Sequence, residues 1–194
     1  YLSNFNFNEF STWLLFVVMI TYILFYLFIF CRMHNTNKKI SNISISIVGG
    51  RKVGKTSLIK CLASGGKNCC QYAKHTLKDD FTALNMKLGG EDEVMLQLWE
   101  NGAESFNAIC ILYDVTSRES YEEGVLQLKK IREKHPKLPI MLLANKQDLE
   151  NKRVVMEYEG EIVAIEHSTL FNEVSCHHGL SVLESAEEFI RSIL

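Results

Sequence analysis

The first 31 residues contain no lysine or arginine, and Glu9 is their only charged residue. A cleaved secretory signal peptide normally has a basic leader, a short apolar core and small residues at its cleavage site. Here the apolar segment ends in Phe30, Cys31 and Arg32, none of which is a small residue of the cleavage-site type. These absences argue against a signal peptide.

The chain also lacks an excess of charge of either sign and any paired cysteine motif. Its formal net charge is −2, and residues 32–194 hold all 21 Lys and Arg together with every Asp and Glu except Glu9. Proteins that bind nucleic acid normally carry a basic patch, so we expect no nucleic-acid partner. The six cysteines form no CxxC pair and no spacing of a secreted disulfide framework, which indicates a reducing compartment.

One segment is apolar and uncharged. Residues 13–31 read WLLFVVMITYILFYLFIFC, in which Thr21 is the only plainly polar residue. As a helix, these nineteen residues would span about 28 Å, close to the roughly 30 Å of a bilayer core. A buried core helix is the alternative, but such a helix is rarely apolar on every face. The sequence therefore predicts one transmembrane helix.

The charges that flank this segment predict its orientation. Arg32, Lys38 and Lys39 follow it, whereas only Glu9 precedes it. Cytoplasmic flanks are enriched in Lys and Arg, so we expect a single-pass membrane protein whose C-terminal domain faces the cytosol. The predicted organisation is an N-terminal flank at 1–12, the membrane helix at 13–31, a linker at 32–42 and one domain at 43–194.

Strand and helix patterns alternate along the C-terminal domain. Residues 108–115 and 140–144 are continuous apolar runs, which are typical of parallel strands buried on both faces. Residues 81–88 and 94–99, joined by a loop with Gly and Asp, indicate a hairpin. Further strands are expected at 43–48 and 170–174, and helices at 56–63, 120–135 and 183–193. This alternation predicts an α/β fold around a mostly parallel sheet of six strands.

A phosphate-binding motif follows the first expected strand. Residues 49–56, GGRKVGKT, satisfy the pattern G-x-x-x-x-G-K-[ST], with a strand before them and a helix after them. The glycines allow backbone N–H groups to surround phosphate oxygens, and the helix N-terminus adds partial positive charge. Lys55 can reach the β and γ phosphates, and the Thr56 hydroxyl can bind Mg²⁺. The alternative is a glycine-rich turn with a solvated lysine.

A second motif predicts which base is bound. Residues 145–148, NKQD, directly follow the apolar run 140–144. The Asp148 carboxylate can accept hydrogen bonds from N1–H and the N2 amine of guanine, whereas adenine offers neither donor. A site built on such polar pairing can discriminate by roughly 10⁴-fold. Alone, the tetrapeptide could be a plain surface loop, but about ninety residues after a phosphate loop it predicts guanine nucleotide.

With these motifs, LYDVTSRES (112–120) and EVSCHHG (173–179) make residues 43–194 resemble the Ras superfamily of small GTPases. LYDVTSRES and DLENKRVV (148–155) are most similar to its Rab and Ras branches. The resemblance implies a P-loop NTPase G domain with a doubly wound, mostly parallel sheet. It also implies that GTP or GDP, with Mg²⁺, lies at the C-terminal ends of the strands.

The resemblance further implies which residues contact the ligands. Thr56 and Thr76 are the expected metal ligands, although Thr76 is otherwise an ordinary threonine and Lys78 stands where relatives have Gly. Ser175, Cys176 and His177 stand where relatives have Ser-Ala-Lys, and a solvated loop is the other reading of His177. The expected nucleotide-binding residues are Gly49, Arg51, Lys52, Val53, Gly54, Lys55, Thr56, Ser57, Asn145, Lys146, Asp148, Ser175, Cys176 and His177.

The segment that carries hydrolysis in relatives is altered here. Relatives have Asp-x-x-Gly-Gln after the third strand, and the Gln orients the attacking water. Glu100 stands in place of the Asp, Gly102 comes one position early, and no Gln follows. Arg51 occupies a position where relatives often have a small residue, so its side chain should obstruct an activator's arginine finger. We expect impaired hydrolysis.

The same segment is also short by about a dozen residues. Only residues 100–107 separate the third expected strand from the fourth, whereas parallel crossovers normally need a dozen residues or more. Eight extended residues span at most about 28 Å. Returning along a strand of roughly 20 Å and sideways by about 10 Å would use most of that length. We expect either a taut connection without a helix or a sequence that has lost a segment.

Three functions are compatible with these observations. The first is a membrane-tethered GTPase switch that an exchange factor loads and a cytosolic effector recognises. The second is a pseudo-GTPase, a nucleotide-stabilised binding module that does not cycle. The third is a GTPase subunit similar to the β subunit of the signal-recognition-particle receptor, which also has an N-terminal span and a GTPase-type domain. NKQD suits that reading, but LYDVTSRES and DLENKRVV suit the Rab and Ras branches better.

Overall fold

The structure is a computed structural model that describes residues 19–20, 41–66, 81–88, 92–100 and 106–194. The chain divides into two units, Tyr1–Lys39 and Ile40–Leu194. Within the described residues, no helix is both long and apolar enough to cross a membrane. Of the predicted membrane helix at 13–31, only Met19 and Ile20 are described, and both are helical. The membrane helix therefore stays a prediction, as do the flank at 1–12 and most of the linker.

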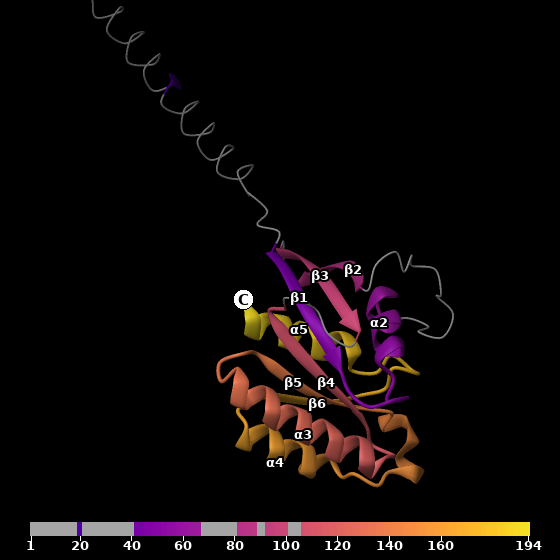
Figure 1. Ribbon diagram of the computed structural model, residues 1–194. Helices are drawn as coiled ribbons and strands as arrows, with labels where there is room; N and C mark the ends of the chain where they lie inside the picture. Colours follow the sequence, from indigo (N-terminus) through magenta and orange to yellow (C-terminus); the bar gives the residue numbers. More distant parts are fainter. Residues whose placement is uncertain (1–18, 21–40, 67–80, 89–91, 101–105) are drawn as a thin grey trace, which may run out of the picture. The chain divides into compact units, whose positions relative to one another are not determined.

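The second unit is built on one sheet of six strands. These are β1 (Ser41–Val48), β2 (Phe81–Leu88), β3 (Asp92–Glu100), β4 (Ala108–Asp114), β5 (Ile140–Asn145) and β6 (Leu170–Val174). Their spatial order is β2-β3-β1-β4-β5-β6 (Figure 1). Only β2 runs antiparallel to its neighbour β3, and every other pair is parallel. The predicted α/β fold with a mostly parallel six-stranded sheet is confirmed.

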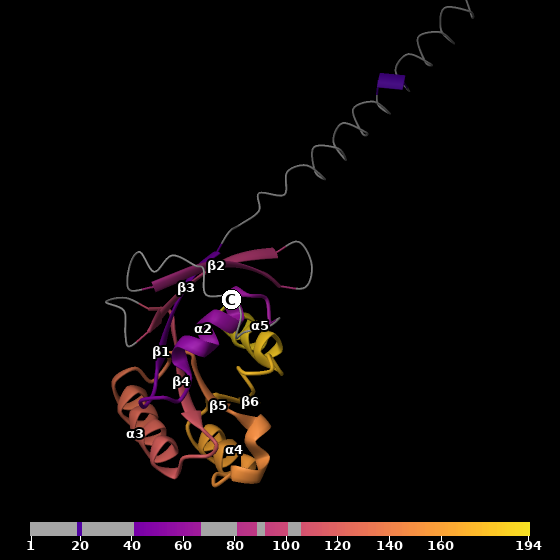
Figure 2. The ribbon, with the colours of Figure 1, turned by 90° about the vertical axis from the view of Figure 1, so that its right-hand side faces the viewer.

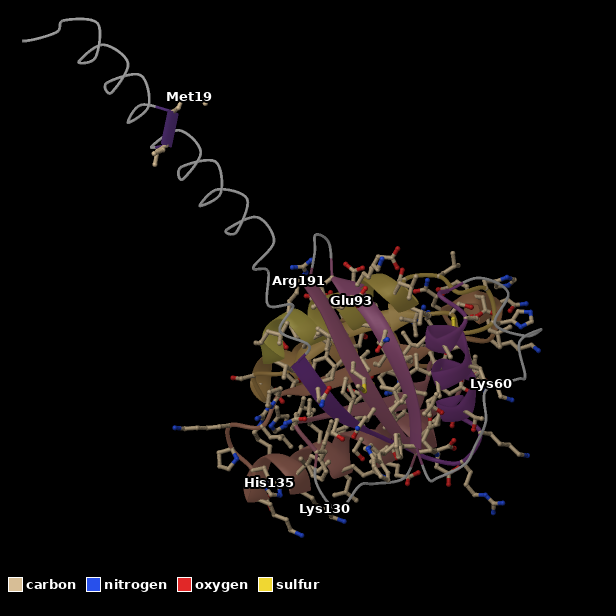
Figure 3. The ribbon with its side chains drawn as sticks, turned by 90° about the horizontal axis from the view of Figure 1, so that it is seen from above. Met19, Lys60, Glu93, Lys130, His135 and Arg191 are labelled. Carbon is tan, nitrogen blue, oxygen red and sulfur yellow. The ribbon has the colours of Figure 1, made fainter. Side chains whose placement is uncertain are left out.

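Helices cover both faces of this sheet. They are α2 (Lys55–Ala63), α3 (Arg118–Lys134), α4 (Glu157–Glu166) and α5 (Val182–Ile193), with a 3-10 helix, η1 (Gln147–Lys152), between β5 and α4. Figures 1 and 2 show α3 and α4 on one face and α2 and α5 on the other. In Figure 3, Lys130 of α3 and His135, which directly follows α3, lie on the opposite side of the sheet from Arg191 of α5. This is the layering expected of a doubly wound sheet.

The strand patterns explain why two helix layers form. In β4, Cys110 and Leu112 join the core under α2 and α5, whereas Ile109 and Ile111 join the core under α3 and α4. Side chains alternate between the faces of a strand, so a strand buried on both sides needs an unbroken apolar run. All residues of β4 and β5 are buried. The two continuous runs were therefore correctly interpreted as central strands.

The connection between the third and fourth strands has to cover a shorter distance than predicted. Along β1, the partner of Glu100 at the end of β3 is Ile47, and the partner of Ala108 at the start of β4 is Ile45. The chain thus returns by two residues, about 7 Å, rather than by a whole strand. It also crosses two strand spacings, about 10 Å. The intervening residues 101–107 can cover this distance without a helix.

The described end of this connection is attached to β1. Asn107 donates its backbone N–H to Ser44 O at 2.8 Å, and its side-chain Oδ1 accepts from Ser44 N at 2.8 Å. The indole Nε1 of Trp99 donates to Ser44 Oγ at 3.1 Å. Asn107 therefore extends the β1–β4 ladder and fixes where β4 begins.

Two features differ from the sequence-based expectation. β1 begins at Ser41, two residues before the predicted domain boundary. The helix α4 was not predicted at all. Its sequence, EYEGEIVAIE, has a glycine at its centre and apolar residues on both the inward and the outward side, so no single apolar stripe marks the side that is buried. Gly160 is required there because a Cβ would lie 2.3 Å from the Phe171 ring.

Candidate functional site

The phosphate-binding motif forms the turn between β1 and α2. Gly54 is the N-cap of α2, has φ +106° and offers no side chain to cap the helix. The first turn of α2, which the structure describes completely, contains no acidic residue. Its backbone N–H groups are therefore left for an external acceptor. A helix N-terminus in this state is suited to bind phosphate.

Two glycines give the loop its shape. Gly49 has φ +145°, and a Cβ on it would lie 2.1 Å from the carbonyl oxygen of Leu112 in β4. Gly54 would place a Cβ 2.3 Å from Asn145 Nδ2. Both contacts are too short for any side chain, so the backbone packs against β4 and β5 only because these residues are glycine. This close approach leaves the N–H side of the loop open.

The Lys55 side chain forms hydrogen bonds with the backbone of the loop. Its ammonium donates to Gly49 O at 3.0 Å and to Gly50 O at 2.9 Å. These bonds hold the positive charge over the centre of the turn, where the sequence pattern places the β and γ phosphates. Arg51, Lys52 and Ser57 are exposed around the loop, and Val53 is buried below it. The predicted phosphate-binding residues are thus brought together.

Asn145 connects the phosphate loop with the base-reading loops. Its side chain is buried, donates from Nδ2 to Val53 O at 2.8 Å, and accepts at Oδ1 from Cys176 N at 3.1 Å. Both polar atoms are therefore used within the protein. Asn145 joins the segments 49–57, 145–148 and 175–177, and its own contact with a nucleotide stays a prediction.

Lys146 is held by a residue that the sequence analysis quoted without assigning a role. Lys146 has φ +68°, and its ammonium forms an ion pair with Asp114 at the end of β4. The backbone N–H and the hydroxyl of Thr116 donate to the same carboxylate at 2.8 and 2.7 Å. Burial disfavours the charged form of Asp114, but hydrogen bonds from Lys146 and Thr116 outweigh it and lower the pKa of Asp114. The sequence did contain a signal for this role of Asp114, because a charged residue stands at the end of a buried apolar strand.

Asp148 is oriented by Ser175. The Ser175 hydroxyl is buried and donates to Asp148 Oδ1 at 2.5 Å, while it accepts from His178 N at 3.2 Å. This arrangement fixes the carboxylate that the sequence analysis assigned to guanine. The loop after β6 and the NKQD segment therefore form one unit.

The remaining two predicted residues of that loop have different roles. The Cys176 backbone N–H bonds Asn145, and its thiol is buried, which, with the nearby charge of Asp148, raises the thiol pKa to about 12. A thiol with this pKa is protonated and unreactive at neutral pH. His177 is exposed and packs edge-on against His178, with 4.7 Å between ring centroids. Contact of Cys176 and His177 with a nucleotide stays a prediction.

Thr56 and Glu100 form the part of the site that suits a divalent cation. The Thr56 hydroxyl lies 3.0 and 2.8 Å from the two carboxylate oxygens of Glu100. Two oxygens that share an octahedral Mg²⁺ lie about 3 Å apart, so this pair fits the ion. Across the described residues, no group of three His, Cys, Asp or Glu could hold a metal by itself. An ion would therefore depend on Thr56, Glu100 and phosphate oxygens, as Mg²⁺ in nucleotide sites does.

Thr76, the other predicted metal ligand, lies outside the described residues, and so does Gly102. Their assignments stay predictions.

Comparisons with known proteins agree with this geometry. Residues 44–194 match the sequence profile of the Ras family. A Ras and EF-hand domain-containing protein homolog from Mus musculus is 33% identical over an alignment 181 residues long, and this alignment covers 82% of this chain. The chain spans only 28% of the length of that mouse protein.

Proposed function

Because this chain belongs to the Ras family, we propose that it binds GTP and GDP together with Mg²⁺ and presents the bound nucleotide to protein partners. The observation that carries this proposal is the meeting of three sequence-distant segments at Asn145, which bonds Val53 O and Cys176 N. The Asn145 side chain thus fixes the positions of the phosphate loop and the base-reading loop relative to each other. A glycine-rich turn without a ligand would not need this link.

Different described residues would bind different parts of the nucleotide. The backbone N–H groups at the start of α2 and the Lys55 ammonium would hold the phosphates. The Asp148 carboxylate, oriented by Ser175, would accept from the guanine edge. Lys146, fixed by Asp114, would line the base pocket beside it. Each of these groups is held by a second residue, so little ordering is needed when the nucleotide binds.

The metal would be bound by Thr56 and Glu100. When bound, Mg²⁺ supplies charge neutralisation at the β and γ phosphates. Glu100 holds the Thr56 hydroxyl at this position and adds the negative charge that the ion needs. The longer glutamate side chain in place of aspartate still reaches Thr56.

The nucleotide proposal is tested by changing the base-reading carboxylate. Asp148→Asn should lower the affinity for GDP by roughly 100-fold or more, because a charged acceptor for two donors is lost. The same change should raise the affinity for xanthosine diphosphate, whose ring offers an acceptor where guanine offers the N2 amine. Fluorescent nucleotide titrations in Mg²⁺ measure both effects.

The matched control for this test is Glu150→Gln, which makes the same acid-to-amide change in η1 at an exposed carboxylate paired with Arg153. It should leave the affinity for GDP within about twofold, because Glu150 is exposed and Arg153 keeps its ion pair with Glu173. Equal affinity of the unmodified chain for ADP and GDP would contradict the proposal.

We further propose that this chain holds GTP with little turnover, as a pseudo-GTPase or a very slow switch. The described site keeps the groups that bind the ground state, namely Lys55, Thr56 and Asp148. Residues 101–107, which follow Glu100, contain no glutamine, and Arg51 projects from the phosphate loop as an exposed side chain. Residues 101–105 lie outside the described part, so this proposal rests on sequence there.

We also propose that residues 13–31 anchor the domain to a membrane with residues 40–194 in the cytosol. The support is the uncharged apolar sequence and the three cationic residues that follow it within 32–39. In cells, the full chain should stay with membranes after carbonate extraction, while a chain with two arginines introduced at Val17 and Phe25 should be released. A glycosylation acceptor placed after Leu194 should stay unmodified, and its glycosylation would reverse the proposed orientation.

A further inference from the structure

The outward face of α4 carries an apolar stripe where a surface helix normally carries polar residues. Tyr158, Ile162 and Ile165 are 60%, 51% and 78% exposed. They are spaced by four and three residues, so they lie within about 60° of arc on one side of the helix. The opposite side is the packed one, because Gly160 and Ala164 are buried against the sheet. Single exposed apolar residues are ordinary, but an aligned set of three forms a patch.

The fold does not explain this stripe. A helix on the surface of a sheet buries one apolar side and directs polar residues to solvent. Here the buried side is made by Gly160 and Ala164 with the half-buried Val163, and the three larger apolar residues point the other way. Removing them from water would be favourable by about 25 cal/mol per Å² of apolar area buried. The spacing i, i+4, i+7 is that of the anchors with which a helix enters an apolar groove or packs on another helix.

Acidic residues border the stripe on both sides. α4 contains four glutamates and no lysine or arginine. One of them, Glu159, is bound to Arg118 by two hydrogen bonds at 2.6 and 2.9 Å. The other three, Glu157, Glu161 and Glu166, are exposed. By helical geometry, Glu161 lies about 40° from one border of the stripe and Glu166 about 40° from the other.

We propose that this α4 stripe, Tyr158, Ile162 and Ile165 with its border of Glu161 and Glu166, docks a basic amphipathic helix of a partner protein. The charge pattern selects this occupant. A second copy of the chain would bring the same acidic borders together, and like charges across an interface oppose association. A lipid surface with anionic headgroups would be repelled as well. A helix with an apolar stripe flanked by Lys or Arg would pack its apolar residues against the α4 stripe and pair its cations with the bordering glutamates.

The docking surface is separate from the nucleotide site. α4 covers the face of the sheet opposite α2, which carries the phosphate-binding turn (Figures 1 and 2). A partner on α4 therefore does not touch residues 49–57. We expect its affinity to be the same with GDP and with a non-hydrolysable GTP analogue bound, unlike that of a partner that recognises the nucleotide state.

The test uses two fluorescent 18-residue model peptides and the full chain in nanodiscs of zwitterionic lipid. Both peptides carry leucines at the spacing i, i+4, i+7, and their other positions are lysine in one and glutamate in the other. Fluorescence anisotropy should show binding of the lysine peptide alone. Ile162→Gln with Ile165→Gln keeps every charge and should weaken this binding about tenfold or more. Glu161→Gln with Glu166→Gln should weaken it and reduce its salt dependence.

The matched control is Leu194→Gln, which replaces an equally exposed residue, 65% accessible, at the end of α5 on the other face of the sheet. It should leave peptide binding unchanged. Because glutamine suits a helix at least as well as isoleucine, the stripe variant should keep the thermal midpoint of the unmodified chain.

Three outcomes would overturn the proposal. Unchanged binding of the lysine peptide to the Ile162→Gln, Ile165→Gln variant would show that the attraction is only electrostatic. A thermal midpoint lowered by several degrees would show that the stripe packs within the fold. Loss of self-association, or of binding to phosphatidylserine vesicles, in the same variant would assign the stripe to a second copy or to lipid.

Discussion

GTP bound to this chain should persist in a single-turnover assay, with hydrolysis roughly 10³–10⁵-fold slower than in a small GTPase stimulated by its activator. Hydrolysis in this class depends on positioning and electrostatics at the γ-phosphate rather than on covalent chemistry. Lys55 and Thr56 are in place and act on the ground state as well as on the transition state. The missing glutamine acts only on the transition state, so turnover should fall while affinity is kept.

The exposed side chain of Arg51 should add a second obstacle, because it projects from the loop beside the expected γ-phosphate. Arg51→Gly and Lys52→Gly are a matched pair, since each removes one exposed cation from this loop and Lys52 already has φ +63°. Neither change alone should restore hydrolysis, because neither supplies a residue that orients water. Insertion of a relative's switch segment between Glu100 and Phe106, combined with Arg51→Gly, should restore it.

The measurement is release of labelled phosphate from preloaded GTP, with and without a membrane extract as a source of activator. Fast release from the unmodified chain, stimulated by the extract, would contradict the prediction. It would mean that another side chain, such as Glu100, orients the attacking water. Slow release after the insertion as well would place the defect in the scaffold rather than in the short segment.

Local sequence patterns predicted the parts of this fold that a single segment determines. β4 and β5 were identified because burial on both faces requires an unbroken apolar run, and both strands are fully buried. The phosphate loop was identified because the chemistry of Gly49, Gly54 and Lys55 requires those residue types at that spacing. The match to the Ras family covers the same residues.

The sequence was less informative where a property depends on several segments at once. The distance that the β3–β4 connection must cover was misjudged because it depends on the register of β3 and β4 against β1, which places Glu100 and Ala108 opposite Ile47 and Ile45. The role of Asp114 could not be assigned from its own neighbours, because its partner Lys146 is 32 residues away. α4 was not predicted because its apolar residues lie on both the buried and the exposed side of the helix, so its sequence shows no single buried stripe.

The glycine at the start of α2 should be the residue on which nucleotide binding depends most strongly. Gly54 has φ +106°, and a Cβ there would lie 2.3 Å from Asn145 Nδ2, which donates to Val53 O at 2.8 Å. Gly54→Ala must therefore displace Asn145, which also holds Cys176 N. The phosphate and base-reading loops would lose their common link, and the N–H groups at the start of α2 would turn from the phosphates.

We expect Gly54→Ala to lower GDP affinity by roughly 100-fold or more, since several charge-assisted hydrogen bonds are lost together. Gly65→Ala is the matched control, because Gly65 also has a left-handed φ of +67° but its Cβ would meet nothing within 4 Å. It should cost about 1–2 kcal/mol of stability and leave affinity nearly unchanged. GDP titration, with thermal unfolding of each ligand-free variant, separates the two effects. If Gly65→Ala loses nucleotide as strongly as Gly54→Ala, affinity follows the stability of α2 and the role assigned to the Asn145 link is wrong.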